Sequence, residues 1–181
     1  MSRAREIADL GRGGTSGQIL QTVSASFNGT QTISYNTVED ITDLSCSMTI
    51  ASGNKVLIFA NVNTGSSQDG YGAIYVTDGS NNLILQNSTG TGNQINASIA
   101  VTPSDADAGD VYLTQNQPFN YLWTPGVTSI TVKLRGQCTY SDSNDRLMIN
   151  TMYDSSNAAH ITKGTSTLTL FEVQAWVDQE M

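Results

Sequence analysis

Charged side chains are scarce in this chain of 181 residues. Asp, Glu, Lys and Arg together make up 13% of it, about half of the roughly 25% found in ordinary soluble domains. Sixteen residues are acidic and eight are basic, so the formal charge is −8. Because phosphate groups repel such a surface, we expect no binding to nucleic acid or to an anionic membrane. Ser, Thr and Asn fill about a third of the chain, so the polar surface consists mainly of uncharged groups.

Long hydrophobic runs are also absent. No apolar run approaches the 18 residues of a membrane-spanning helix, so we expect no membrane insertion. The opening MSRAREIADLG carries charges where a signal peptide needs its apolar stretch, which argues against secretory export. Hydrophobic residues still make up 38% of the chain, enough to bury the core of one domain and to argue against intrinsic disorder.

Cysteine and histidine are too few for most catalytic and metal sites. Cys46 and Cys138 cannot form a disulfide scaffold. Each lies an even number of residues from neighbouring apolar residues and so on the same face of its predicted strand. This predicts two buried thiols. A disulfide bridge between them is the alternative. His160 is the single histidine and no G-x-S-x-G motif is present, so no catalytic triad is recognisable. We expect no cofactor and no enzymatic activity; a depolymerase is the enzyme alternative.

Carboxylates gather in one segment that could bind a cation. Asp105, Asp107 and Asp110 lie in TPSDADAGD and carry the oxygen ligands that Ca²⁺ prefers. The segment lacks the register and the closing glutamate of an EF-hand loop, so a solvated acidic loop is the simpler interpretation. These three residues are weak calcium candidates, and we assign no metal site.

From Gln18 onward the chain has the period of two that is typical of β-strands. Short runs rich in β-branched and aromatic residues alternate with Gly, Asn, Asp and Ser. Turn signals stand at 27–30 and 78–81, and no ten-residue stretch follows a helical period. The pattern predicts an all-β fold, an antiparallel β-sandwich or jelly roll. The expected strands are 18–25, 30–35, 44–50, 55–62, 71–77, 82–86, 95–101, 119–123, 127–136, 146–150 and 166–176.

Two of these segments, KVLIFANV (55–62) and FEVQAWV (171–177), carry apolar residues at both parities. A strand that is apolar on both faces is buried on both sides. A lone sandwich of two sheets leaves one face of each sheet in water, so the excess favours a subunit interface. Central strands covered by loops are the alternative.

The beginning of the chain differs from the rest. Ser2 can cap a short helix, and a Gly-rich linker follows up to residue 17. We divide the chain into an attachment peptide with its linker (1–17) and a β-sandwich domain (18–181). The peptide is either a docking segment for a partner protein or a frayed terminus. In the docking interpretation the anchoring residues are Arg3, Arg5, Ile7 and Leu10.

Aromatic rings are the remaining candidates for molecular recognition. Tyr and Trp combine a flat ring with a polar tip, which suits a surface that binds sugars. Packing at sheet faces is their more common role. The rings in loop-like stretches are the best candidates for contact with a host-surface glycan: Tyr112, Tyr140 and Tyr153.

Four segments carry a resemblance to a known class of proteins. DITDLSCSMTIASGNKVLIFANV (40–62), FNYLWTPGVTSITVKLR (119–135) and STLTLFEV (166–173) resemble strands of a module seen in structural proteins of phages and environmental viruses. SRAREIADLG (2–11) is similar to the peptide that begins many phage tail-fibre proteins. Together the matches touch both ends and most of the body.

This resemblance implies a fold, a partner and a place. It implies a jelly roll like that of tumour necrosis factor, assembled as a homotrimer on the outer surface of a virion and made in the host cytoplasm. Another virion protein would hold the N-terminal peptide. The chain lacks a long repetitive shaft, so the resemblance implies a short fibre, spike or knob. A capsid decoration protein and a receptor- or glycan-binding head are the alternatives.

Overall fold

The computed structural model describes residues 17–66, 71–85, 97–101, 114–139, 145–152 and 163–175. These residues form β-strands connected by turns, and among them there is no helix that could cross a membrane. The attachment peptide predicted at the N-terminus lies outside the described residues, apart from Gly17. The strands are β1 (Ile19–Phe27), β2 (Gln31–Ser34), β3 (Val38–Thr49), β4 (Lys55–Ser66), β5 (Gly72–Asp78), β6 (Ile99–Val101), β7 (Thr114–Trp123), β8 (Ser129–Cys138), β9 (Arg146–Ile149) and β10 (Ser166–Val173).

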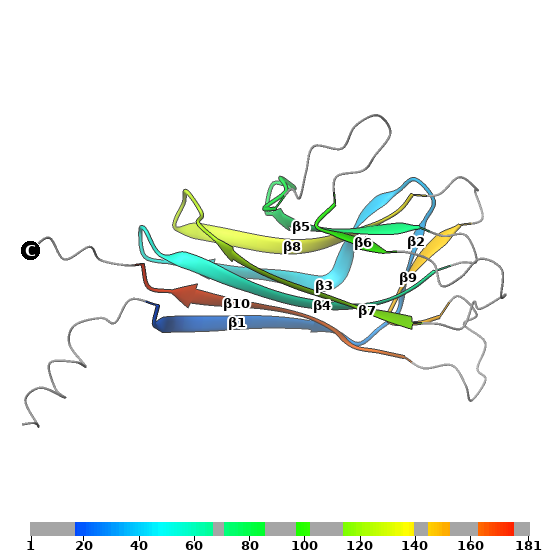
Figure 1. The fold of residues 1–181 in the computed structure, drawn as a ribbon, viewed down its shortest axis with the longest axis horizontal. Coiled ribbons are helices and arrows are strands. Elements are labelled where there is room, and N and C mark those ends of the chain that lie inside the picture. Colours follow the sequence, from blue (N-terminus) through cyan, green and yellow to red (C-terminus); the bar gives the residue numbers. More distant parts are fainter. Residues whose placement is uncertain are drawn as a thin grey trace, which may run out of the picture.

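The strands form two antiparallel sheets that pack face to face (Figure 1). In sheet A, β10 lies between β1 and β4, and β7 pairs with the other edge of β4. The short strands β9 and β2 extend sheet A from the end of β4. Sheet B has the order β3-β8-β5-β6.

The pairing of the eight main strands is nested. Without β2 and β9, the first strand pairs with the last (β1 with β10), the second with the seventh (β3 with β8), the third with the sixth (β4 with β7), and the two central strands with each other (β5 with β6). One long hairpin wrapped around a core gives this order, which is that of a jelly roll. The predicted all-β antiparallel sandwich is therefore confirmed, and its topology is that of a jelly roll.

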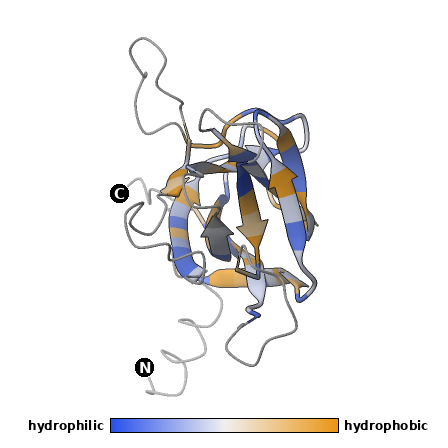
Figure 2. Cartoon of the chain, turned by 90° about the vertical axis from the view of Figure 1, so that its right-hand side faces the viewer, coloured by the Kyte–Doolittle hydropathy of each residue, from blue (hydrophilic) through white to orange (hydrophobic). Residues whose placement is uncertain are grey.

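The core follows from the alternation along the strands. On β8 and β10 every second side chain is buried, and the inward positions of β4 are buried as well. Seen end-on, hydrophobic and hydrophilic bands alternate along the ribbons (Figure 2). At Gly136 a Cβ atom would lie 2.5 Å from Ile33 Cδ1, so the absence of a side chain lets β2 pack onto β8. The largest fully buried side chains include Ile33, Leu44, Ile58, Ile74, Leu134, Leu147, Ile149, Leu168 and Leu170.

The buried side-chain amide of Asn150 stabilises the end of the sandwich at which β1 ends and β10 begins. Asn150 is fully buried in the left-handed region, with φ of 61°, a conformation that Asn adopts more readily than most residues. Its Nδ2 donates to the carbonyls of Phe27 (2.7 Å) and Gly29 (3.0 Å), and its Oδ1 accepts from Ser166 Oγ (2.6 Å). The turn after β1 is thereby tied to β9 and β10.

Several expected elements differ from the structure; strand β7, for example, begins at Thr114, five residues before its predicted start. Strand β3 begins at Val38, six residues before the predicted start, and contains a register shift between Asp40 and Ser45. Segment 82–86 was expected to be a strand, but its described residues form only one bridge, Thr77 with Leu83, after the turn at 78–81. That turn was predicted correctly. Its residue with positive φ is Asn81 and not Gly79.

Both cysteines are free and buried, as their parity predicts. Cys46 pairs with Val132 on β8, and Cys138 lies six residues farther along that strand. Six residues of strand span about 20 Å, whereas a disulfide needs Cα atoms within roughly 7 Å. The alternative of a bridge between them is therefore wrong for this fold.

Candidate interaction surface

An apolar patch lies on the outer face of sheet A. Leu57 on β4 stands opposite Phe171 on β10 and opposite Leu122 on β7, and Phe59 follows two residues later on the same side of β4. Phe59 is 46% exposed and Leu122 is 45% exposed, whereas Leu57 and Phe171 are half-buried. We call these four residues the apolar patch.

The two rings of the apolar patch touch each other. Phe59 and Phe171 meet edge to face, with ring centroids 5.7 Å apart and planes at 86°. Such a pair holds both side chains in place. The patch is therefore a fixed surface, and all of its residues except Leu122 lie in the two segments that the sequence marks as apolar on both sides.

More apolar surface is exposed at the end of sheet A from which both termini leave. The pairing of β1 with β10 shifts between Ile19 and Gln21, so both Ile19 and Leu20 stand near Val173. Such a bulge re-aims side chains, and Ile19 and Leu20 are both exposed. The main-chain bonds Gly17 N to Gln174 O and Gln174 N to Gln18 O hold the two chain ends side by side there (Figure 1).

The outer face of sheet A carries no acidic side chain at its described positions. On the four main strands of this face (β1, β10, β4 and β7), Lys55 is the single charged residue that faces outward, and Glu172, the carboxylate of β10, points into the sandwich. In a chain of charge −8, a face without acidic groups reduces charge repulsion between copies. The outward-facing residues are Thr22, Ser24 and Ser26 on β1; Thr167, Thr169, Phe171 and Val173 on β10; Lys55, Leu57, Phe59, Asn61 and Asn63 on β4; and Asn116, Pro118, Asn120 and Leu122 on β7.

Glu172 is held inside by neutral donors. It is only 4% exposed, and its carboxylate accepts hydrogen bonds from Gln21 Nε2 (2.6 Å), Asn54 Nδ2 (2.6 Å) and Ala51 N (2.8 Å). Burial opposes ionisation, but these hydrogen bonds outweigh it and lower the pKa of Glu172. Asn54 Oδ1 also accepts from Ala175 N. The cluster thus ties β1, the turn after β3 and the end of β10 together.

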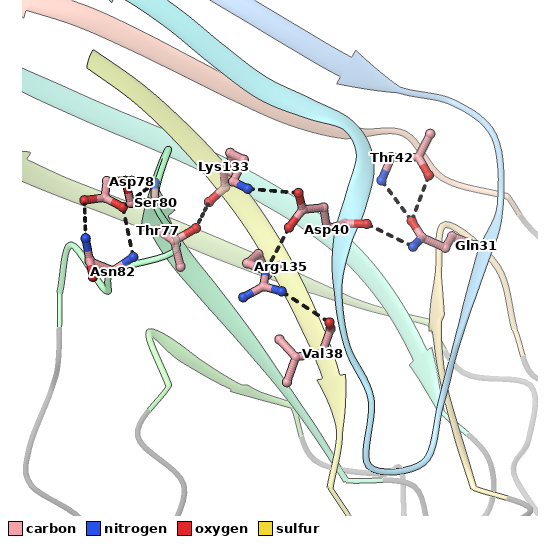
Figure 3. Close-up of polar contacts among 10 residues, drawn as sticks. All are labelled: Gln31, Val38, Asp40, Thr42, Thr77, Asp78, Ser80, Asn82, Lys133 and Arg135. Atoms are coloured by element: carbon pink, nitrogen blue, oxygen red, sulfur yellow. Dashed lines mark hydrogen bonds and ion pairs between the residues drawn. The ribbon is translucent and has the colours of Figure 1, made fainter. Parts of the chain in front are cut away.

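The outer face of sheet B carries charge. Lys133 and Arg135 on β8 both reach Asp40 on β3, at 3.0 Å from Nζ and 2.8 Å from Nε (Figure 3). The hydrogen bond from Lys133 is the largest cause of the lowered pKa of Asp40, and Arg135 adds to it against partial desolvation. Gln31 Nε2 donates to the Asp40 carbonyl at 3.1 Å, while Gln31 Oε1 accepts from Thr42 N at 2.9 Å.

A second polar cluster of sheet B lies at the turn after β5. Asp78 accepts hydrogen bonds from the main-chain N–H groups of Ser80 (2.8 Å) and Asn82 (2.9 Å) and from Asn82 Nδ2 (2.9 Å) (Figure 3). Desolvation opposes ionisation of Asp78, but these bonds outweigh it and lower its pKa. The donors lie in the turn or directly after it, so the cluster stabilises the turn.

The site residues predicted from the sequence all lie outside the described residues. These are the anchoring residues Arg3, Arg5, Ile7 and Leu10, the surface tyrosines Tyr112, Tyr140 and Tyr153, the calcium candidates Asp105, Asp107 and Asp110, and His160. Of the other rings, Tyr121 and Trp123 pack against the core, the role that we expected most rings to have. In the described ranges, no three His, Cys, Asp or Glu residues are grouped as metal ligands.

Sequence comparison identifies no relative of this chain. No protein-family model matches it, and a search of curated proteins finds no match.

Solved structures of similar fold are remote in sequence. The Eiger TNF of S. frugiperda is 10% identical, with a TM-score of 0.44 over 88% of this chain and 98% of that one. A structure of infectious bursal disease virus, Gt strain, is 14% identical, with a TM-score of 0.43 over 89% of this chain and 39% of that one. The VP2 subviral particle of infectious bursal disease virus is 12% identical, with a TM-score of 0.37 over 86% and 42%. The jelly-roll assignment accordingly rests on the nested strand pairing.

Proposed function

We propose that this protein is a structural virion protein, a short homotrimeric fibre, spike or knob that its N-terminal peptide attaches to a phage particle. The observation that carries the proposal is the apolar, acid-free outer face of sheet A. The role requires no catalysis and no cofactor. The resemblance of segments 2–11, 40–62, 119–135 and 166–173 to phage structural proteins supports the same assignment.

The apolar patch gives a driving force for association. Removing apolar surface from water stabilises a complex by roughly 25 cal/mol per Å². Exposed aromatic side chains such as Phe59 are enriched in protein–protein interfaces. Buried between copies, this face accounts for the apolar residues at both parities of β4 and β10.

Charge favours a second copy of the chain as the partner. Copies of charge −8 repel one another, so they associate best through a face without acidic groups, and the outer face of sheet A is such a face. Most soluble oligomers are closed and symmetric. We assign three copies because the resemblance to phage structural proteins implies a trimer.

The position of the termini suits attachment at one end. In a cyclic oligomer every copy presents the same end in the same direction, so three leader peptides would emerge together beside the starts of β1. Three tethered peptides bind far more firmly than one, because the second and third contacts form at high effective concentration. The opposite end of the jelly roll would then face outward from the particle.

Size-exclusion chromatography with light scattering tests the assembly. We expect three times the 19.3 kDa mass of one chain. Phe59→Asp places three negative charges in the interface and should give a monomer. Ser47→Asp adds the same charge to the exposed outer face of sheet B and should leave the trimer intact. A monomeric wild type at micromolar concentration, or a trimeric Phe59→Asp variant, contradicts the proposal.

Deletion of residues 1–17 tests the attachment. The shortened protein should remain a folded trimer and should no longer join particles, which sedimentation with particles that lack the protein measures. Assembly of the shortened protein onto particles would show that the body makes the contact. Imaging the labelled protein on the particle then separates a tail fibre from a capsid decoration protein, because the two positions differ.

A further inference from the structure

Asn61 stands at the centre of the outer face of sheet A. It lies on β4, the strand with β10 on one side and β7 on the other, two residues after Phe59 and on the same side. Thr167 is its neighbour on β10 and Pro118 its neighbour on β7. Asn61 and Lys55 are thus the two polar residues of β4 that flank the apolar patch on this face.

The side-chain oxygen of Asn61 is covered and has no hydrogen-bond partner in the described part of the chain. A covered acceptor without a donor destabilises a protein, because the hydrogen bonds that it made with water are lost. Asn63, two residues later on the same face, has no covered side-chain atom without a partner, and its Nδ2 donates to the Thr165 carbonyl at 2.7 Å. The unpaired oxygen is therefore a property of position 61 and not of asparagine on this strand.

We propose that Asn61 pairs with Asn61 of the neighbouring copies and fixes the number and register of the copies; this inference rests on the proposed self-association. An amide carries both donors and an acceptor, so identical residues related by symmetry satisfy one another. In a ring of three, each amide donates to the next and accepts from the previous one. To reach a neighbouring copy, the oxygen has to leave its covered position by rotation of the side chain about its terminal torsion, which is soft.

An apolar face by itself does not fix how copies align, so a polar residue within it is needed to select one arrangement. Hydrophobic attraction has no direction, so copies that meet through Leu57, Phe59 and Leu122 could slide past one another or add further copies. One amide in an apolar interface weakens association slightly but favours the single arrangement in which the amides meet. A buried asparagine in a coiled coil selects oligomer state in this way.

Replacement by leucine separates this inference from the proposed function. We expect Asn61→Leu to associate but to lose the single mass of the wild type, giving several species in light scattering. Asn120→Leu is the matched control, because Asn120 faces outward on β7 opposite Phe59 and is exposed. It gains the same side chain and should keep the single mass.

Cysteine cross-linking tests the contact directly. A disulfide requires Cα atoms within roughly 7 Å, so Asn61→Cys should form covalent dimers under mild oxidant. Because each chain then offers one thiol at this position, at most two chains of every three are linked. Ser47→Cys on sheet B should not, and the natural Cys46 and Cys138 are buried. A monomeric wild type overturns the proposed function itself. A wild-type oligomer with no cross-link at position 61, or with an unchanged single mass in Asn61→Leu, overturns the role of Asn61 alone.

Discussion

The two outer faces of the sandwich differ in where they put their carboxylates. Sheet B holds Asp40 on its outer face, where the group is 52% exposed and two cations reach it. Sheet A turns Glu172 inward, where three neutral donors surround it. The inward carboxylate needs a complete set of hydrogen bonds to offset the loss of hydration. In return the outer face of sheet A stays free of negative charge, so one face is suited to contact between copies and the other to water.

Glu172→Gln is expected to have the largest effect on the folded chain. The introduced NH₂ group would face the donors of Gln21, Asn54 or Ala51, so at least one donor would lose its partner. We expect the free energy of unfolding to fall by about 2–4 kcal/mol, measured by urea denaturation. Glu39→Gln is the control, since the Glu39 carboxylate accepts a weak bond from Thr37 at 3.3 Å, and it should change stability by less than about 0.5 kcal/mol. Equal effects of both substitutions would remove the contrast between the faces.

Phe171→Ala tests the outer face of sheet A itself. The change removes the edge-to-face contact with Phe59 and about half of the aromatic surface of the apolar patch. We expect association to weaken by about fivefold or more, because truncation of a hot-spot residue removes more than about 1 kcal/mol of binding free energy. Sedimentation equilibrium measures the change, and Thr131→Ala on the outer face of sheet B is the matched control. Unchanged association of Phe171→Ala would show that the patch lies outside the interface.

Acid should act on sheet A through Glu172. Its pKa in the folded protein is lowered, so its stabilising contribution is present above the ordinary glutamate pKa of about 4.3 and is lost as pH falls through the lowered folded value. Between neutral pH and that window, the difference in Tm between wild type and Glu172→Gln should be constant; below it the difference should shrink. A constant difference down to the lowest pH at which the protein folds would show that the carboxylate contributes no such term.

Asp40→Asn should have the smallest effect. Although the pKa of Asp40 is also lowered, its carboxylate is largely exposed and water screens the pair. We expect a loss of about 0–1 kcal/mol at low salt that disappears in about 1 M salt. Chemical denaturation at both salt concentrations measures it. A loss as large as that of Glu172→Gln, or one that persists at high salt, would show that sheet B depends on its ion pairs as a buried cluster does.

The sequence predicted local features well. Alternation located most strands, the parity of Cys46 and Cys138 predicted two buried thiols, and the turn at 78–81 followed from its residue types. The beginning of β3 was missed because VEDITD is polar, as an edge strand with a register shift can be. Segment 82–86 was overpredicted because its apolar residues pack against the core without an extended partner strand.

The polar residues of sheet A escaped prediction for a different reason. Glu172 lies in a segment whose apolar residues predicted burial on both sides, and nothing near it in the sequence indicates a partner. Gln21 and Asn54, its donors, are 151 and 118 residues away. Asn150 likewise acquires its role from a turn more than 120 residues earlier. Hydrogen bonds between residues so far apart leave no local pattern.

By itself, the sequence determined the class of this protein: a period of two, few charges and abundant turn residues leave an antiparallel sandwich with an uncharged polar surface. Only the tertiary structure decided which strands became neighbours. Alternation fixes the face on which a side chain lies, because successive residues of a strand point to opposite sides. Neighbours across a sheet depend instead on strand order and register, which nested pairing of distant segments sets. That pairing brought Phe171 into contact with Phe59 and brought three hydrogen-bond donors to the carboxylate of Glu172.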